Sequence, residues 1–197
     1  MTGVLVVPST YHTFKSWFDF PVSLLTSDLQ FGHMTHQANY VFLSLLARRS
    51  KGPIVEFGTF TGRGACNMAL NSEQQVYTID LGHSGDDYEY PAYVPGSDFI
   101  DLDIPNKPIL IVGDSATVDI PVAPHSAGLV FIDGGHDYET VKSDSERAFR
   151  LVRPDGVILW DDYDIGWPGV VRYLHELAEA QPLVLFEQER FVAWGLI

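Results

Sequence analysis

The stretch from Pro53 to Ala69 constrains the fold of this chain more than any other. It reads Pro-Ile-Val-Glu-Phe-Gly-Thr-Phe-Thr-Gly-Arg-Gly-Ala-Cys-Asn-Met-Ala. A short apolar run with an acid leads through three closely spaced glycines into a helix-forming segment, which is typical of a strand, a tight turn and a helix. Gly58 and Gly62 allow a sharp turn because they carry no Cβ, and the following helix N-terminus offers free N–H groups. The stretch therefore predicts the first unit of a nucleotide-binding α/β sheet.

The spacing of these glycines bears on the cofactor. A dinucleotide-binding turn has the pattern Gly-x-Gly-x-x-Gly, and Phe60 stands at its second glycine position, where it would block a pyrophosphate. The chain instead has Glu-x-Gly-x-x-x-Gly-x-Gly, which begins at Glu56. This pattern resembles motif I of class I S-adenosylmethionine-dependent methyltransferases, in which the glycine turn faces the amino-acid half of the cofactor. The resemblance implies that Glu56, Gly58, Thr59 and Gly62 contact the cofactor; an ordinary strand-to-helix turn is the alternative.

A second expected strand, residues 75–80, ends in an acid that suits the ribose. Asp80 follows the glycine turn by about 20 residues, the interval at which such folds place a ribose-binding carboxylate. A turn aspartate is the alternative for Asp80 alone, but together with the glycine turn we interpret it as a ribose ligand. Asp114 and Ser115, after the next strand, are assigned to the adenine.

Strand-like and helix-like stretches alternate along most of the chain. The expected strands cover 53–57, 75–80, 108–112, 128–132 and 156–160, and the expected helices cover 35–49, 62–71, 138–152 and 168–180. From Pro182 two more strands follow, joined by a short turn. This order predicts an α/β fold: a Rossmann-like class I methyltransferase sheet of seven strands, the last antiparallel, with helices on both faces. We expect one domain over residues 1–197, with residues 1–50 forming an N-terminal segment, irregular to residue 33, and a helix.

Composition narrows the class of protein and its partners. The length of 197 residues and the hydrophobic content of 46% suit one globular domain. The net charge of −14 leaves few cations for phosphate contacts, so we expect a small-molecule substrate and no nucleic acid. We expect no membrane partner, and the single cysteine, Cys66, indicates a buried thiol in a reducing cytoplasm. Formation of a homo-oligomer is left open.

Residues 81–107 interrupt the alternation. They contain prolines, acids and aromatic residues without a helical period, where a methyltransferase usually has a crossover helix. A long segment of this kind in a compact domain is typically functional or disordered. Its aromatic residues favour an ordered lid, substrate loop or partner surface, and we predict that it shapes the acceptor site and is mobile without ligand.

Two later strands also end in acids. Asp133 follows the strand expected at 128–132, and Asp161 and Asp162 follow the strand expected at 156–160. The carboxyl ends of neighbouring parallel strands meet at one edge, so these side chains should converge. Close carboxylates repel one another unless a proton or a cation neutralises them, and hard oxygen ligands suit Mg²⁺. Capping or turn aspartates are the alternative for either strand alone, but the two together favour a metal site.

His136 lies three residues after Asp133 and should face the same pocket. A near-neutral imidazole can accept the proton of an acceptor hydroxyl. A structural histidine that caps the next helix is an equally weighted alternative.

Two motifs extend the resemblance. The sequences Ile-Asp-Gly-Gly-His-x-Tyr-x-x-Val from residue 132 and Asp-Asp-Tyr from residue 161 resemble macrolide-sugar O-methyltransferases and cephalosporin-hydroxylase-like proteins, over roughly residues 34–180. The resemblance implies Mg-assisted O-methylation of a small-molecule hydroxyl. Metal-independent methyl transfer and a non-catalytic S-adenosylmethionine-binding protein are the alternatives. By this likeness Asp133 is a catalytic residue and a cofactor contact as well as a metal ligand, Asp161 and Asp162 are metal ligands, and His136 is the base.

Overall fold

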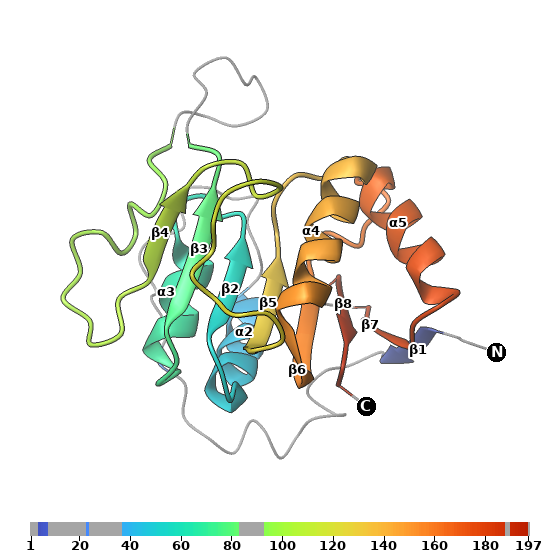
Figure 1. Cartoon of the computed structure of the whole chain (residues 1–197). Coiled ribbons are helices and arrows are strands. Elements are labelled where there is room, and N and C mark those ends of the chain that lie inside the picture. Colours follow the sequence, from blue (N-terminus) through green and yellow to red (C-terminus); the bar gives the residue numbers. More distant parts are fainter. Residues whose placement is uncertain (1–3, 8–22, 24–36, 83–92, 188–189, 197) are drawn as a thin grey trace.

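The framework of the molecule is one eight-stranded sheet in the order β1-β7-β8-β6-β5-β2-β3-β4 (Figure 1). The structure is a computed structural model that describes residues 4–7, 23, 37–82, 93–187 and 190–196. The strands are β1 Val4–Val7, β2 Ile54–Phe57, β3 Val76–Asp80, β4 Ile109–Val112, β5 Ala127–Ile132, β6 Val152–Trp160, β7 Leu183–Phe186 and β8 Phe191–Trp194. The helices are α2 Gln37–Arg49, α3 Arg63–Leu70, α4 Tyr138–Leu151 and α5 Pro168–Ala178.

The direction of the strands confirms the predicted fold class. Strand β8 runs antiparallel to both β6 and β7, whereas the other pairings among the described strands are parallel. Strands β2 to β8 supply the seven strands of the predicted Rossmann-like methyltransferase sheet. The chain order reverses between β2 and β5, which is the topological switch point where open α/β sheets bind ligands.

The expectation of an irregular segment at residues 1–33 is wrong at its start. Val4–Val7 forms β1 and pairs in parallel with β7 at the edge of the sheet. This pairing depends on a strand far away in the sequence, so the local pattern does not reveal it. Strand β6 likewise begins at Val152, directly after α4, and not at residue 156.

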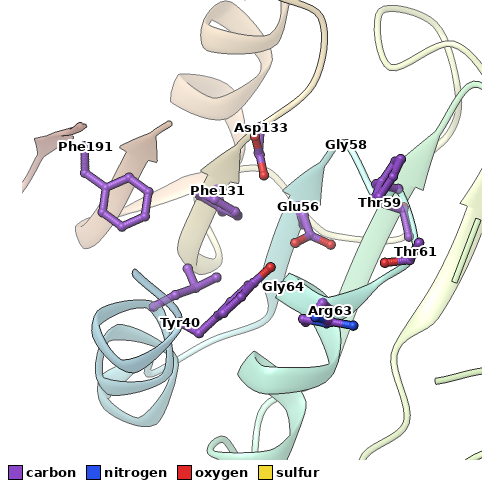
Figure 2. Close-up of a pocket in the computed structure, with 12 residues that line it drawn as sticks. Tyr40, Glu56, Gly58, Thr59, Thr61, Arg63, Gly64, Phe131, Asp133 and Phe191 are labelled. Carbon is purple, nitrogen blue, oxygen red and sulfur yellow. The ribbon is translucent and has the colours of Figure 1, made fainter. Parts of the chain in front are cut away.

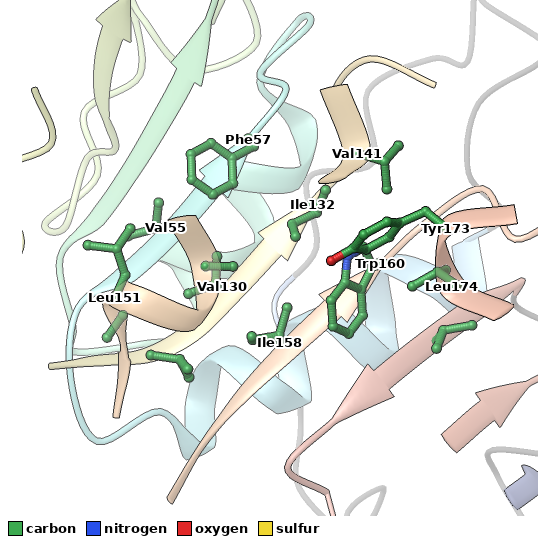
Figure 3. Close-up of a cluster of buried hydrophobic side chains, with 14 of the residues drawn as sticks. Val55, Phe57, Val130, Ile132, Val141, Leu151, Ile158, Trp160, Tyr173 and Leu174 are labelled. Carbon is green, nitrogen blue, oxygen red and sulfur yellow. The ribbon is translucent and has the colours of Figure 1, made fainter. Parts of the chain in front are cut away.

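Both faces of the sheet are covered. Val55 and Phe57 of β2 pack on the side of α4 and α5, while Ile54 packs on the side of α2 and α3, because successive side chains of a strand point to opposite faces. Figure 3 shows the hydrophobic cluster on the side of α4 and α5, in which Trp160 lies among side chains of these helices. Within the described residues, no helix is long and apolar enough to cross a membrane.

The register of the parallel strands brings the candidate site together. Phe57 of β2 pairs with Ile79 of β3 and with Ile132 of β5, and Ile132 pairs in turn with Trp160 of β6. The residues that end or follow these strands are therefore level with one another at one edge of the sheet. They are Gly58, Asp80, Asp133 and Asp161.

The described part of the predicted loop, residues 81–82 and 93–107, contains no helix, and its second stretch packs on the glycine turn. The backbone N–H of Gly96 donates to the Phe60 carbonyl at 3.0 Å, and that of Asp98 donates to the Thr61 carbonyl at 2.7 Å. Phe99 is buried beside Gly62. Residues 83–92 lie outside the described part of the chain, and the mobility of the loop stays a prediction.

Candidate active site

The glycine turn lies against the chain that follows β5. Gly58 has a φ of 97°, and a Cβ there would overlap the carbonyl oxygen of Asp133. Gly62 precedes α3 and lies against Phe99, while a Cβ at Gly64 would overlap the carboxyl group of Glu56. The missing side chains therefore let the turn, the first acid of the motif and the end of β5 approach one another closely.

Glu56 is a buried acid with a hydroxyl partner. Its side chain is 1% exposed, and Thr78 Oγ1 donates to its Oε2 at 2.5 Å. Thr59 Oγ1 lies 2.6 Å from Thr78 Oγ1, so the two hydroxyls link the glycine turn to Glu56. Burial raises the pKa of Glu56 to about 8, with a smaller upward contribution from Asp80, while the hydrogen bond from Thr78 acts in the opposite direction. A cationic ligand beside Glu56 would favour its charged form.

Asp80 organises two turns. Its Oδ2 accepts hydrogen bonds from the backbone N–H groups of Thr59 at 3.2 Å and Phe60 at 2.9 Å. Its Oδ1 accepts from the N–H of Gly82 at 2.9 Å and from the Tyr93 hydroxyl at 3.2 Å. Asp80 thus fulfils the turn role that sequence analysis kept as an alternative, and its role toward the ribose stays a prediction.

The residues assigned to the adenine lie beside Asp80. The N–H of Gly113 donates to the Asp80 carbonyl at 2.8 Å, which places the following turn next to that strand end. Asp114 is exposed and accepts from the N–H of Ala116. The carbonyl of Ser115 accepts from Arg147 of α4. Their contact with an adenine stays a prediction.

A pocket opens between α2, the glycine turn, β5 and β8 (Figure 2). Including its open mouth it has a volume of about 610 Å³. Of the predicted site residues, Glu56, Gly58, Thr59 and Asp133 line it, whereas the others lie outside its walls. The full lining consists of Tyr40, Leu43, Glu56, Gly58, Thr59, Phe60, Thr61, Arg63, Gly64, Phe131, Asp133 and Phe191.

The three predicted metal ligands influence one another electrostatically. Burial raises the pKa of Asp133 well above its ordinary value, and the charges of Asp161, Asp162 and Glu56 raise it further. Burial and the charge of Asp162 raise the pKa of Asp161 to about 7. The only cation that acts on Asp133 among these contributions is Arg190, which lowers its pKa. The edge of the sheet therefore gathers acids whose charged forms disfavour one another, so that without a cation they favour the protonated form.

His136 is held by contacts on two sides. Its Nε2 lies 2.9 Å from Asp162 Oδ2, and its ring stacks on that of Trp167 with the centroids 3.8 Å apart. The capping alternative for His136 is wrong, because Asp137 caps α4 by accepting from the N–H groups of Glu139 and Thr140.

The donor set of the three acids suits a hard cation in its chemistry, since Mg²⁺ prefers carboxylate oxygens. Within the described residues, however, no three His, Cys, Asp or Glu side chains form a ready metal-binding group. Asp162 Oδ2 instead contacts His136 Nε2, and Asp162 Oδ1 lies 3.8 Å from Arg190 Nη2. A metal ion bound by Asp162 would compete with these two contacts.

Several neighbours of the site were not predicted. Thr78 gives only a weak local signal, because its strand also contains the hydroxyl of Tyr77 and the carboxylate of Asp80. Tyr93, Trp167 and Arg190 give none, because each reaches the site through the tertiary fold from a segment without a motif.

This sheet, with a pocket against its glycine turn and acids at the same edge, has the Rossmann-like fold of class I methyltransferases. The model of a family described as a methyltransferase domain matches residues 55–163, more than half of the chain. The chain belongs to this methyltransferase-domain family, as its motifs predicted. A search of curated proteins found no match to the sequence.

Solved structures share the fold. The O-methyltransferase from Bacillus cereus in complex with S-adenosylhomocysteine is 20% identical, with a TM-score of 0.59 and 83% of each chain covered. The S-adenosylhomocysteine-bound methyltransferase PaMTH1 from Podospora anserina is 15% identical, with a TM-score of 0.61, covering 82% of this chain and 80% of that one. A TDP-rhamnose 3′-O-methyltransferase of calicheamicin biosynthesis is 19% identical, with a TM-score of 0.55, covering 94% of this chain and 92% of that one.

Proposed function

We propose that this methyltransferase transfers the methyl group of S-adenosylmethionine to a hydroxyl oxygen of a small molecule, with His136 as the base. The observation that carries the proposal is the position of Asp133, which lines the pocket and whose pKa is raised by burial and by the neighbouring charges of Asp161 and Asp162. Asp133 thus brings one of these acids to the pocket formed by the glycine turn, and His136 is connected to the same acids through its contact with Asp162. The O-methyltransferases among the structures of the same fold support transfer to oxygen.

The cofactor would lie along the carboxyl edge of β2 to β4. Glu56, Gly58 and Thr59 would bind its methionine end, where the charge of Glu56 complements the sulfonium and the ammonium group. Gly62 would contact the cofactor through its backbone, because Phe99 fills the space at its side-chain position, and Asp80 would accept hydrogen bonds from the ribose. Asp114 and Ser115, on the turn beside Asp80, would contact the adenine.

The reaction would be an in-line displacement. The acceptor oxygen forms a bond to the methyl carbon as the carbon–sulfur bond breaks, and the sulfur keeps the electron pair, giving S-adenosylhomocysteine. The proton of the acceptor hydroxyl passes to His136. Because the sulfonium already makes the methyl group electrophilic, the chain mainly positions and deprotonates the acceptor.

Magnesium belongs to the proposal, with Asp133, Asp161 and Asp162 as its ligands. When bound, the ion would make an acceptor hydroxyl more acidic. A metal-independent transfer is the second candidate, and the contact of 2.9 Å between His136 and Asp162 favours it, because that carboxylate can orient the imidazole without an ion.

The acceptor is proposed to be a small molecule and neither nucleic acid nor membrane. The net charge of −14 disfavours polyanions. Tyr40, Phe131 and Phe191 line the pocket away from the glycine turn, as Figure 2 shows, and would accommodate an apolar part of the acceptor. A cytoplasmic location and a possible homo-oligomer are kept as predictions, the first on the basis of the single buried Cys66.

The test is a methylation screen of hydroxylated small molecules with S-adenosylmethionine, read by mass spectrometry. We expect a methyl ether and S-adenosylhomocysteine, with turnover lost in His136→Ala and Asp161→Asn but unchanged in His125→Ala, an exposed histidine on another loop. Calorimetry should show S-adenosylhomocysteine binding to all four proteins. Full turnover in excess EDTA would eliminate the metal, unchanged turnover in His136→Ala would eliminate the base, and absence of binding to the parent would eliminate the cofactor assignment.

A further inference from the structure

The carboxylate of Asp80 already has as many hydrogen-bond donors as it can take. A carboxylate offers about four lone-pair positions. In this structure four donors face Asp80: three backbone N–H groups, of Thr59, Phe60 and Gly82, and the hydroxyl of Tyr93. A ribose hydroxyl can therefore bond to Asp80 only after one of these donors leaves.

The four donors differ in how easily they can leave. Thr59 and Phe60 belong to the glycine turn, and Gly82 belongs to the turn that directly follows β3, so releasing them would require a change of backbone conformation. Tyr93 is the single side-chain donor of the four, and its contact of 3.2 Å is among the longest. Rotation of one side chain is enough to break that hydrogen bond.

The ring of Tyr93 is held independently of its hydroxyl. It packs against Phe60 with the ring centroids 4.5 Å apart and the planes tilted by 42°. Phe60 is itself part of the glycine turn, at a positive φ of 49°. The hydroxyl of Tyr93 is thus directed to Asp80 Oδ1 by an aromatic contact at the edge of the predicted ribose site.

We propose that Tyr93 competes with the ribose for Asp80. Its hydroxyl occupies the oxygen of Asp80 that a ribose hydroxyl takes, and cofactor binding displaces it. The inference rests on the proposed role of Asp80 in cofactor binding. The free protein keeps the carboxylate of Asp80 satisfied with its own hydroxyl, and the affinity for the cofactor is lower by the free energy of that hydrogen bond.

The experiment is calorimetric titration of S-adenosylhomocysteine into the full chain and into Tyr93→Phe. Phenylalanine keeps the ring that packs on Phe60 and removes only the hydroxyl, so we expect binding about tenfold tighter than in the parent. The matched control is Tyr138→Phe, which removes a tyrosine–carboxylate hydrogen bond to Glu176 on the α4–α5 side of the molecule, and it should leave the affinity unchanged.

A double-mutant cycle locates the effect. In an Asp80→Ala background the tighter binding caused by Tyr93→Phe should disappear, because no carboxylate is left for which the hydroxyl and the ribose could compete. Unchanged or weaker binding by Tyr93→Phe would overturn the inference alone, as would a gain in affinity that persists in the Asp80→Ala protein. Absence of S-adenosylhomocysteine binding to the parent would overturn the cofactor assignment, and the inference with it.

Discussion

At the scale of single residues, Glu56 is protonated in the native protein at pH values at which it is ionised in the unfolded chain. Burial raises its pKa from 4.5 to about 8. Between these values the native state binds more protons than the unfolded state, so the free energy of unfolding falls as the pH rises through this window. Asp161 and Asp144, whose pKa values burial raises to about 7 and about 6, act in the same direction.

We therefore predict that the cofactor-free protein is less stable at pH 8.5 than at pH 5.5. Glu56→Gln should reduce this loss, because the amide keeps an acceptor for Thr78 but does not ionise. Thermal unfolding of each protein at the two pH values measures this loss of stability. The control is Glu73→Gln, a substitution at an exposed position. An equal loss of stability in the parent and in Glu56→Gln would contradict the prediction.

Gly58 and Gly82 share a left-handed backbone but differ in their surroundings. Their φ angles are 97° and 83°, so alanine at either position meets the same backbone strain, about 1–2 kcal/mol. A Cβ at Gly58 would also overlap the backbone of Asp133, whereas the nearest atom to a Cβ at Gly82 is Val112 Cγ1 at 3.2 Å. We expect Gly58→Ala to lose about 2–5 kcal/mol of unfolding free energy in urea and Gly82→Ala only the strain. Equal losses would show that the overlap relaxes without cost.

The site residues that were predicted from the sequence are those that belong to a recognisable spacing pattern along the chain. Glu56, Gly58 and Asp80 belong to patterns that a strand, a turn and a helix impose locally. Thr78 and Tyr93, which hold two of these acids, depend on strand register and on the packing of residues 93–107. Their contacts follow from the tertiary structure, which no short motif encodes.

At the scale of elements, the first turn of α5 supports the loop that carries His136. A Cβ at Gly169 would overlap the His136 carbonyl and lie 2.6 Å from the Tyr138 N–H nitrogen. Gly169→Ala must therefore move α5 or the loop. We predict that methyl transfer to an identified acceptor falls at least about tenfold while S-adenosylhomocysteine affinity stays within about twofold, because the cofactor residues lie on other elements.

The control for this prediction is Gly166→Ala. Gly166 is exposed just before α5, and the nearest atom to its Cβ would be Asp164 Oδ1 at 3.3 Å. Transfer by this variant should match the parent. If Gly169→Ala also transfers methyl groups at the parental rate, the packing of α5 does not determine the position of His136.

The order of elements was predictable because hydrophobic periodicity and turn residues are local features. Pro168 at the start of α5 and the apolar runs that became β2 to β8 are read directly from the sequence. The cap of α4 is not a local feature of this kind. The helix start was predicted at residue 138, but side-chain geometry decides whether His136 or Asp137 satisfies its N–H groups.

At the scale of the whole molecule, the strand order separates the proposed cofactor residues from the edge of the sheet that β1 forms. Strands β2, β3 and β4, with the proposed cofactor residues, form one side, while β8, β7 and β1 form the other. The acids that follow β5 and β6 lie between them. Figure 1 shows β4 and β1 at opposite edges of the sheet. Changes at the β1 edge should therefore affect stability without affecting cofactor binding.

This separation gives a prediction about β1. Replacing Val4–Val7 with Gly-Ser-Gly-Ser keeps the chain length but removes residues with strand propensity from the pairing with Leu183–Phe186. We expect the free energy of unfolding in urea to fall by about 2–4 kcal/mol, because each backbone hydrogen bond of a strand contributes about 1 kcal/mol. Calorimetry should give an S-adenosylhomocysteine affinity within about twofold of the parent. A large loss of affinity in a variant that is still folded would mean that the two sides of the sheet are coupled, and an unchanged unfolding free energy would mean that β1 contributes nothing to stability.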